Sequence, residues 1–467
     1  MKKINSKGKL FLYALSGMGV NMLNLIIGSY LCDALMVEGF EKNVANWTYL
    51  DKTLVVAVVW SIFVTVSKII DGLVDIPLAS FTDNLKTKWG KRRPAILMGF
   101  VPMLIMYCLF LLPISTDEKS LANTIWFGVI LCLFYIFYTL TMVTYYATFS
   151  EVVDNDKDRL ILSNYKSFFD IIYFVLGYAL IPLLVGSMNI RIVALIFLPL
   201  SLTMLIPLFM LKEESTKECD VLARRKVVEK LAAENKITKE ELIEEKEQPV
   251  KFIESIKYTF KNKNFIVWML VYSFLSFGLQ MFLTGQNVYD SGTLGFEGWQ
   301  ITVVMASSFA LVPLMLFLFN KVVNKKGFKF GYQYCVLSFI IGMAFYGLCR
   351  QDIITNLYLR LALIIVGGIF CSVGIGTFFS VSYIVPSQLA SDEAKRTGKC
   401  NSAMYFAVQG LVAGIATAIS TGIVWVNLKS NNLTDWMPEF VIGACLISFI
   451  LSFILPHSVS NIGKKVS

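Results

Sequence analysis

Two aspartates and a lysine lie close together in a stretch of sequence that is otherwise strongly apolar. The segment reads Lys68-Ile69-Ile70-Asp71-Gly72-Leu73-Val74-Asp75-Ile76-Pro77. Residues three and four apart share one face of a helix, so Lys68, Asp71 and Asp75 form a single charged stripe. Two carboxylates about 6 Å apart repel by roughly 3 kcal/mol at an effective dielectric near 20. Lys68 supplies one compensating charge, and a bound Na⁺ or proton would supply the other.

A cluster that is neutral only when a cation is bound can couple cation binding to movement of the surrounding helices. Charged groups in apolar spans are costly, which makes each one a functional candidate. We therefore predict a cation site, with Asp71 and Asp75 as metal ligands if the ion is Na⁺. A static salt-bridge cluster that holds helices together is the alternative. No cofactor is expected beyond a coupling ion, Na⁺ or H⁺.

The rest of the chain provides the membrane spans that position these residues. The chain has 467 residues, of which 56% are hydrophobic and 16% charged, and a mean hydropathy of +0.64; soluble proteins carry about 25% charged residues. Apolar runs of roughly 20 residues, long enough to cross a bilayer, recur throughout. They fall at 8–34, 52–81, 94–114, 122–151, 163–188, 190–211, 264–290, 298–322, 331–349, 354–384, 400–425 and 434–456. The sequence predicts an all-α membrane protein with twelve transmembrane helices.

Basic residues mark one side of the membrane, because they gather in the amino-terminal tail and in alternate loops. The loop residues are Lys86, Lys88, Lys91, Arg92, Arg93, Lys157, Arg159, Lys321, Lys325, Lys326, Lys329, Lys395, Arg396 and Lys399. By the positive-inside rule both termini are expected in the cytoplasm, with the protein in the cytoplasmic (inner) membrane. The tail leads directly into a full-length span, so no cleavable signal peptide is expected. The net charge of +9 therefore predicts orientation and not nucleic-acid binding.

One long polar segment divides the spans into two sets of six. The Lys- and Glu-rich linker 212–263 separates an amino-terminal bundle, 1–211, from a carboxy-terminal bundle, 264–467. The loops 83–93 and 320–329 each place basic residues around a glycine at the same point of each set. This indicates two six-helix repeats with a substrate site between them near the middle of the membrane. Two unrelated short cytoplasmic turns would also explain the likeness.

The second span and its following loop resemble the signature of the glycoside-pentoside-hexuronide:cation symporters. The matching residues are Asp71, Asp75, Asp83 and the run Lys88-Trp89-Gly90-Lys91-Arg92-Arg93-Pro94, without gaps, and related segments cover nearly the full chain. Departures are Lys68 where the family has arginine, Pro77 one place late and Ala79 where it has glycine. The resemblance implies a major-facilitator fold, a sugar bound between the halves, and Asp71 and Asp75 as cation ligands.

The fourth span leaves the identity of the ion open. Relatives offer an acid or amide there, whereas this chain has Met142, with hydroxyls at Thr141 and Thr144. Sodium prefers several hard oxygen ligands, and a proton needs only one carboxyl. We expect Thr144 to serve as the third oxygen beside Asp71 and Asp75 if the ion is Na⁺.

Substrate residues are expected among the polar and aromatic side chains of the spans, since sugars are bound through their hydroxyls and their C–H faces. Where the resemblance implies an acid in the first span and a lysine in the eleventh, this chain has Asn21 and Gly414. The candidates are Asn21, Tyr138, Tyr145, Tyr146, Lys166, Asp170, Gln280, Asn287, Tyr383, Tyr405 and Gln409. Such uncharged residues also hydrogen-bond one helix to another, and Lys166 and Asp170, four apart, could simply pair.

The loop after the second span is expected to act as a cytoplasmic gate. Asp83, Lys88, Lys91, Arg92 and Arg93 would pair with neighbouring helix ends in one conformation and release them in the other. Orientation of the protein by positive charge is a simpler role for the same residues.

The predicted function is secondary active symport of a sugar or glycoside with a cation, by a monomer that alternates between two open states. Its partners would be a small-molecule substrate and membrane lipid. The sequence shows no phosphate-binding loop, metal-ligand cluster or nucleophile with a base, so we do not expect an enzyme. The alternatives are the same fold carrying a non-sugar solute or lipid, and a membrane sensor that transports nothing.

Overall fold

The computed structural model describes residues 4, 6–83, 85–153, 156–217, 262–397 and 402–460. Within these ranges every regular element is a helix, and twelve helical stretches are long and apolar enough to cross a membrane. The predicted all-α class and the number of spans are confirmed.

The first six spans run from α1 to α8. They are α1 (Lys7–Ile26) continued by η1 (Ile27–Leu31) and η2 (Asp33–Leu35), α3 (Ala57–Asp83), α4 (Arg92–Phe110), α5 (Leu121–Val152), α6 (Asp156–Val185), and α7 (Ile190–Phe197) continued by η3 (Leu198–Leu205) and α8 (Ile206–Met210). The short α2 (Val44–Trp47) lies in the loop between the first two spans.

The second six spans run from α11 to η7. They are α11 (Lys263–Ser291), α12 (Trp299–Phe309) with α13 (Val312–Lys326), α14 (Phe328–Leu348), α15 (Leu357–Thr397), α16 (Ser402–Thr417) with η5 (Ala418–Trp425) and α17 (Val426–Ser430), and η6 (Thr434–Trp436) with α18 (Met437–Leu451) and η7 (Ser452–Ile454). The four-residue α19 (His457–Ser460) follows.

The eighth and tenth spans differ from the predicted ones in continuity and in length. The eighth span is divided between α12 and α13, because Pro313 is the second residue of α13 and has no N–H to donate to the preceding turn. Helix α15 has 41 residues and continues past residue 384 to Thr397, with Pro386 inside it. The apolar run alone therefore located the membrane part of this helix and not its full length.

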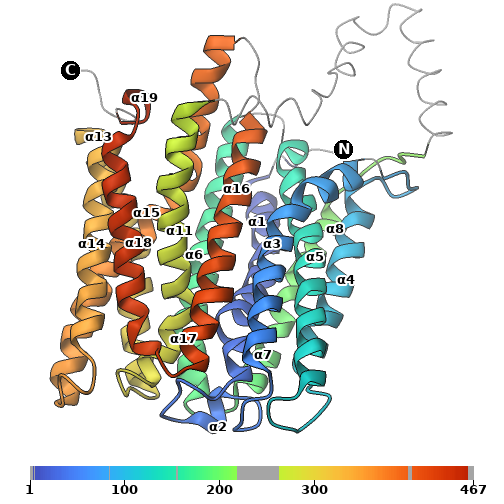
Figure 1. The fold of residues 1–467 in the computed structure, drawn as a ribbon. Helices are drawn as coiled ribbons and strands as arrows, with labels where there is room; N and C mark the ends of the chain where they lie inside the picture. The colour runs from blue at the N-terminus through green and yellow to red at the C-terminus, as the bar shows by residue number, and fades with distance from the viewer. Residues whose placement is uncertain are drawn as a thin grey trace, which may run out of the picture.

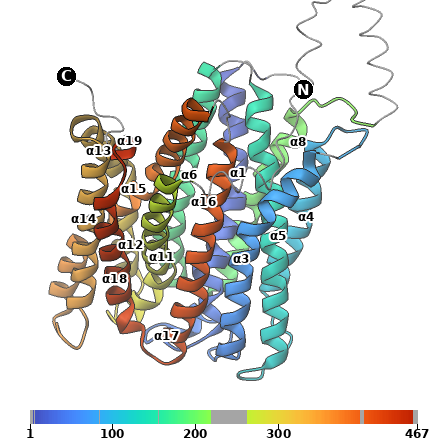
Figure 2. The ribbon, with the colours of Figure 1, turned by 45° about the horizontal axis from the view of Figure 1, so that its top comes forward.

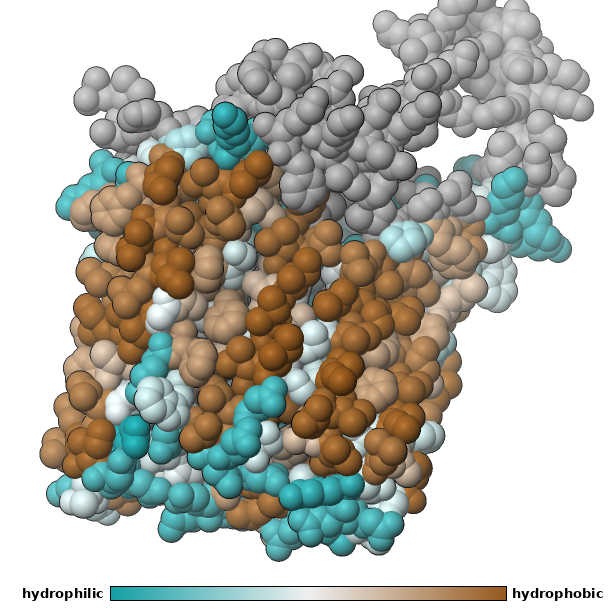
Figure 3. Space-filling view, in the orientation of Figure 1, coloured by the Kyte–Doolittle hydropathy of each residue, from teal (hydrophilic) through white to brown (hydrophobic). Residues whose placement is uncertain are grey.

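The outer surface of the bundle is apolar, as a lipid-facing surface must be. Large hydrophobic side chains such as Val58, Phe209 and Ile450 are more than half exposed. Figure 3 shows a broad hydrophobic band over the helices and a hydrophilic lower rim. This confirms a multi-pass membrane protein.

The start of α1 and the short α19 lie at one end of the bundle, which we call the termini end (Figure 1). The loop containing α2 and the turn after α17 lie at the other end, called here the opposite end. Both views place α13, α14 and α18 on one flank and α3, α4 and α5 on the other (Figures 1 and 2). Each flank is one six-helix half of the chain.

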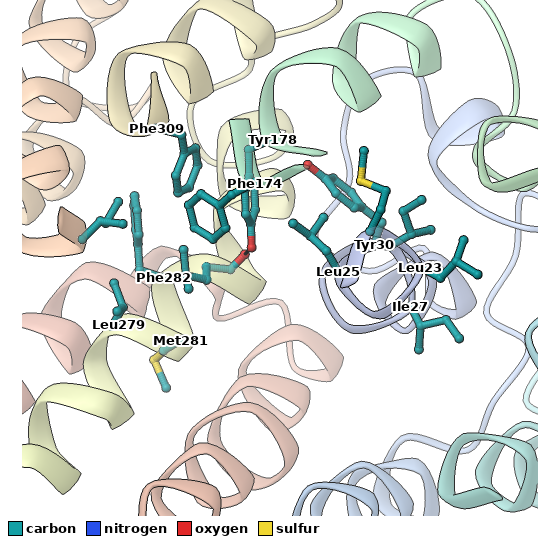
Figure 4. Close-up of a cluster of buried hydrophobic side chains, with 14 of the residues drawn as sticks. Leu23, Leu25, Ile27, Tyr30, Phe174, Tyr178, Leu279, Met281, Phe282 and Phe309 are labelled. Carbon is teal, nitrogen blue, oxygen red and sulfur yellow. Dashed lines mark hydrogen bonds between the residues drawn. The ribbon is translucent and has the colours of Figure 1, made fainter. Parts of the chain in front are cut away.

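The two halves meet along two pairs of helices. Helix α3 packs against α16, η5 and α17, and α6 packs against α12. Figure 4 shows Phe174 and Tyr178 of α6 facing Phe309 of α12, with the rings of Tyr178 and Phe309 stacked at 4.0 Å between centroids. Between these two pairs of helices, α1, α3 and α6 of the first half face α11 and α15 of the second. Residues that could bind a substrate between the halves come from these helices.

Candidate functional site

A cavity of about 200 Å³ lies between the two halves. Helices α1, η1, α3 and α6 line it from the first half, and α11 and α15 from the second. Its polar and aromatic lining residues are Asn21, Asn24, Ser29, Lys68, Gln280 and Thr284, with Tyr173, Phe174, Tyr178 and Phe378. This mixture of hydrogen-bonding groups and aromatic faces suits a solute that carries both hydroxyl groups and C–H surfaces.

Five of the predicted substrate residues form one network at the edge of this cavity. The hydroxyl of Tyr138 donates to Asn21 Oδ1 at 3.1 Å, and Asn21 Nδ2 donates to Asp170 Oδ1 at 3.2 Å. Asp170 is also ion-paired with Lys166, whose Nζ lies 5.4 Å from the centre of the Tyr146 ring. The structure therefore joins α1, α5 and α6 through residues that are up to 149 positions apart in the sequence.

Two other predicted substrate residues connect helices and do not line the cavity. The buried hydroxyl of Tyr145 donates to the main-chain oxygen of Tyr13 at 2.8 Å. Gln409 accepts from Trp268 Nε1 at 2.7 Å and donates to the oxygen of Ser382 at 2.8 Å. These contacts match the helix-to-helix interpretation of polar residues in spans.

The remaining four predicted substrate residues do not belong to one cluster. Gln280 lines the cavity from α11. Asn287 is buried on the same helix, outside the cavity lining, and its amide atoms have no hydrogen-bond partner in the described part of the chain. The hydroxyl of Tyr405 accepts from Asn262 Nδ2 at 2.8 Å. Tyr383 belongs to α15, and its side chain lies outside the described part of the structure.

Lys68 lies in the cavity rather than against the two aspartates. Its Nζ donates to the hydroxyl of Tyr135 at 2.5 Å and lies 4.3 Å from the centre of that ring. Among the described residues, no ion pair within 4.0 Å joins Lys68 to Asp71 or Asp75. The predicted charge partner of the carboxylates therefore also presents a positive charge to whatever occupies the cavity.

The fourth-span oxygen beside Asp71 comes from Thr139 and not from the predicted Thr144. The hydroxyl of Thr139 donates to Asp71 Oδ1 at 2.7 Å. Thr144 is fully buried and donates to the oxygen of Leu140 on its own helix at 2.6 Å. Five residues along an α-helix turn the side chain by about 140°, so the two threonines face different sides of α5. Thr139 lies three residues before Met142, outside the two hydroxyls, Thr141 and Thr144, that the sequence suggested.

Asp75 lies one turn further toward the termini end and is exposed. The charged stripe of α3 thus passes from a lysine in the cavity, through a hydrogen-bonded carboxylate, to a carboxylate open to solvent. In the described ranges no three His, Cys, Asp or Glu residues come together as a metal site. Asp71, Asp75 and Thr139 offer only oxygen atoms, which suits a hard cation such as Na⁺, and either carboxylate can accept a proton.

The predicted gate loop is held by the segment that follows α8. The carboxylate of Glu213 accepts from the backbone N–H groups of Arg92 and Arg93, at 3.0 and 2.9 Å, at the start of α4 where a negative charge is favoured. Gly90 has φ +88°, and a Cβ there would lie 2.3 Å from the Cβ of Glu213. Glycine is required at this turn for both reasons.

The side chains of the predicted gate have different surroundings. Arg92 is buried and its Nη1 donates to Thr82 Oγ1 at 3.4 Å. Lys88 is exposed and Lys91 half-buried. The side chain of Asp83 lies outside the described part of the structure, as do residues 218–261 of the linker.

A buried ion pair joins the two halves near the opposite end. Lys429 Nζ lies 3.6 Å from Asp33 Oδ1 and donates to the main-chain oxygen of Asp33 at 2.5 Å. Trp425 Nε1 donates to the same carboxylate at 3.1 Å. Asp33 is 6% exposed and Lys429 1%. The sequence analysis did not predict this pair, whose members lie 396 positions apart.

The family model for MFS/sugar transport proteins matches residues 12–437 of the chain. The chain belongs to this family. The match confirms the resemblance seen in the second span and its loop, and the family is one of transporters and not of enzymes.

Curated relatives align with only part of the chain. The lactose permease of Lactobacillus helveticus is 30% identical over 156 residues, which cover 32% of this chain and 22% of that protein. The lactose permease of Leuconostoc lactis is 27% identical over 139 residues, covering 28% of this chain and 20% of that protein. The alignments therefore span about a fifth of the length of these relatives.

Solved transporter structures share the fold of this MFS/sugar transport protein along almost its whole length. The nucleoside transporter NupG matches with a TM-score of 0.61 at 16% identity, covering 97% of this chain and 98% of NupG. A D-xylose–proton symporter matches with a TM-score of 0.60 at 14% identity, covering 98% and 99%. At these identities the likeness establishes the fold, and the predicted major-facilitator architecture of two six-helix halves is confirmed.

Proposed function

We propose that this protein transports a sugar or glycoside by symport with Na⁺ or H⁺, through alternating exposure of the central cavity to the two sides of the membrane. The observation that carries the proposal is the position of Lys68, which lines the cavity one turn from Asp71 on the same helix. The substrate site and the carboxylates thus share α3. Movement of α3 when a substrate or a cation binds would therefore change both sites.

The cavity offers suitable contacts for a sugar. Asn24 Oδ1 is buried, lines the cavity and has no hydrogen-bond partner in the described part of the chain, so it can accept from a substrate hydroxyl. Gln280 and Thr284 reach the same space from α11. A substrate bound to both halves favours their approach, because it provides contacts that neither half provides alone.

The carboxylates supply the coupling. Asp75 is exposed in this structure, and closing the termini end over it would bury a second negative charge close to Asp71. Burying an uncompensated carboxylate costs several kcal/mol, so the closure requires a cation at Asp71 and Asp75. Binding of Na⁺ or H⁺ there removes the cost, and the loaded protein can then change its open side.

We further propose that the protein is a monomer in the cytoplasmic membrane with both termini in the cytoplasm. The basic loops at the termini end, such as Lys88 and Lys321, support this orientation. A protease site appended after Ser467 should be cut in inverted vesicles and protected in right-side-out vesicles. Cleavage in right-side-out vesicles would reverse the orientation.

Uptake into proteoliposomes tests the function. The measurement uses a panel of mono- and disaccharides with imposed Na⁺ or H⁺ gradients, and compares wild type with Asp71→Asn and Asp75→Asn. Asp117→Asn, an acid in an exposed loop at the opposite end, is the matched control. Gradient-driven uptake that is lost only in the α3 variants supports the proposal, and the gradient that drives it identifies the ion. A folded protein that accumulates no sugar under either gradient overturns it.

A further inference from the structure

Three lysines at the termini end of α13 border a groove on the outer flank of the second half. Lys321, Lys325 and Lys326 line this groove of about 470 Å³ together with residues of α14 and α15. Helices α13 and α14 stand at the edge of the bundle in both views (Figures 1 and 2). The groove is therefore far from the central cavity and separate from the transport site.

The corresponding loop of the first half has an acidic partner within the chain. There Glu213 accepts from the backbone of Arg92 and Arg93, and Thr216 donates to the oxygen of Leu85 at 2.8 Å. The segment 211–217, which has no regular secondary structure, thus lies against the basic loop 85–91 of the first half. The sequence pattern suggested that this loop and the segment 320–329 are related, so the two can be compared.

The second copy lacks such a cover in the described part of the chain. Helix α13 ends at Lys326, and α14 begins at Phe328 after the single residue Gly327. Within the described residues no carboxylate lies within 4.0 Å of Lys321, Lys325 or Lys326. Lys326 contacts only an aromatic ring there, with Nζ 4.3 Å from the centre of Phe330. Three positive charges therefore line the groove without a counter-charge from the described residues.

The walls of the groove are apolar and open to the membrane. Leu318, Phe330 and Tyr334 line it and are 42%, 45% and 56% exposed. A soluble anion would gain nothing from these walls. A molecule with a negative headgroup and a hydrocarbon chain would pair with the lysines and cover the apolar side chains at the same time.

We propose that this groove binds an anionic phospholipid. Its phosphate contacts Lys321, Lys325 and Lys326, and one acyl chain lies along Leu318, Phe330 and Tyr334 between α13 and α14. Basic pockets between transmembrane helices at the cytoplasmic face are a known way of binding such headgroups. Because the lipid bridges α13, α14 and α15, it stabilises the second half and takes the place that Glu213 has in the first.

Native mass spectrometry of the full chain in detergent, with phosphatidylglycerol or phosphatidylcholine added, tests this proposal. The test variant is Lys321→Gln/Lys325→Gln/Lys326→Gln. Lys86→Gln/Lys88→Gln/Lys91→Gln in the first-half loop is the matched control, since it removes the same charge at the same end. We expect the groove variant to lose bound phosphatidylglycerol roughly tenfold or more, the control to retain it, and phosphatidylcholine binding to be weak in all three proteins.

A Lys→Arg version of the groove variant keeps the charge and should retain the lipid, which separates lost binding from misfolding. Thermal stability gives a second readout: phosphatidylglycerol should raise the melting temperature of wild type and not of the Gln variant. Equal loss of lipid in both Gln variants would mean binding by net charge alone and would overturn the proposal. Stabilisation by inorganic phosphate to the same degree would identify a soluble-anion site and also overturn it.

Discussion

Lys68, Asp71 and Asp75 of α3 have different surroundings, and the surroundings suggest a different role for each. Lys68 is hydrogen-bonded to Tyr135 inside the cavity, Asp71 accepts from Thr139, and Asp75 is exposed. A hydroxyl that donates to a carboxylate stabilises its charged form, and the same oxygen can turn to ligate a cation. Asp71 with Thr139 is therefore the better defined part of the cation site.

Thr139→Val tests this assignment at the level of one hydrogen bond. Loss of a hydrogen bond to a charged group costs about 1.5–3 kcal/mol, so the cation concentration for half-maximal uptake should shift by roughly tenfold or more. Thr144→Val is the matched control on the same helix, because its hydroxyl bonds only Leu140. Titrating uptake with Na⁺ and with pH gives the shift. Equal effects of the two substitutions would remove Thr139 from the site.

At the scale of elements, the crossing of α3 and α16 brings two glycines together. A Cβ on Gly72 would lie 3.7 Å from the Cα of Leu411 and 3.9 Å from the Cα of Gly414, which is ordinary contact distance. Gly414 stands where the resemblance implied a substrate-binding lysine. Small residues let helices approach closely in membranes, so this position contributes to the packing of the two halves.

Substitutions at Gly72 should therefore depend on size. Gly72→Ala fits the available space, and we expect uptake within about twofold of wild type. Gly72→Leu would hold α3 and α16 apart, and uptake should fall by roughly tenfold or more while expression and membrane insertion remain normal. Initial uptake rates per folded protein provide the measurement. Full activity of the leucine variant would show that the halves do not need this close contact.

The buried Asp33–Lys429 pair belongs to the same scale, since it joins the end of the first span to α17. Removing one partner of a buried pair costs about 3–5 kcal/mol, so Asp33→Asn should favour separation of the halves at the opposite end. Cys32 lines the same small cavity as Asp33, Trp425 and Lys429 and reports on this change.

We expect labelling of Cys32 by a membrane-impermeant maleimide, followed by site-resolved mass spectrometry, to be roughly tenfold faster or more in Asp33→Asn. Asp352→Asn, an exposed acid at the same end, should leave the rate unchanged. An unchanged rate in Asp33→Asn would mean that the ion pair does not hold this end closed.

The elements were predictable because their length and composition are local properties. Each apolar run was long enough to span a bilayer, and every predicted span corresponds to a helix. The main differences are the earlier start of α6 at Asp156, the break at Pro313 and the extension of α15. The pairings were not predictable. Tyr138 and Tyr145 lie seven residues apart on nearly one face of α5, yet Tyr138 bonds Asn21 beside the cavity and Tyr145 bonds the backbone near the end of α1. Seven residues separate them by about 10 Å along the helix, and which part of α1 lies at each level depends on how α1 packs against α5.

Lys429 and Asp33 illustrate the same limit over a longer distance, since 396 positions separate them. Which acid pairs with Lys429 depends on how the two halves pack. Thr139 was missed for a related reason, because only the relative rotation of α3 and α5 shows which hydroxyl faces Asp71.

At the scale of the whole molecule, several polar contacts between the halves lie at the opposite end. Besides the Asp33–Lys429 pair, Gln351 Nε2 donates to Glu41 Oε2 at 2.7 Å, and Ser291 Oγ donates to the oxygen of Lys42 at 3.2 Å. Transport by rocking of the halves requires these contacts to break in each cycle. A covalent link that replaces one of them should therefore stop transport and leave the fold intact.

Bridging Glu41→Cys to Gln351→Cys with a short bismaleimide makes such a link, because the two native side chains are in contact across the halves. We expect the bridged protein to lose gradient-driven uptake almost completely and to retain substrate binding measured by equilibrium methods, since the cavity still exists. Arg350→Cys/Asp352→Cys is the matched control: these residues are also in contact, at 2.9 Å, but both belong to the second half. The same reagent should leave uptake by the control unchanged, as in reagent-treated wild type. If the Glu41–Gln351 bridge left uptake intact, the halves would not separate at this end, and the substrate would have to cross by another motion.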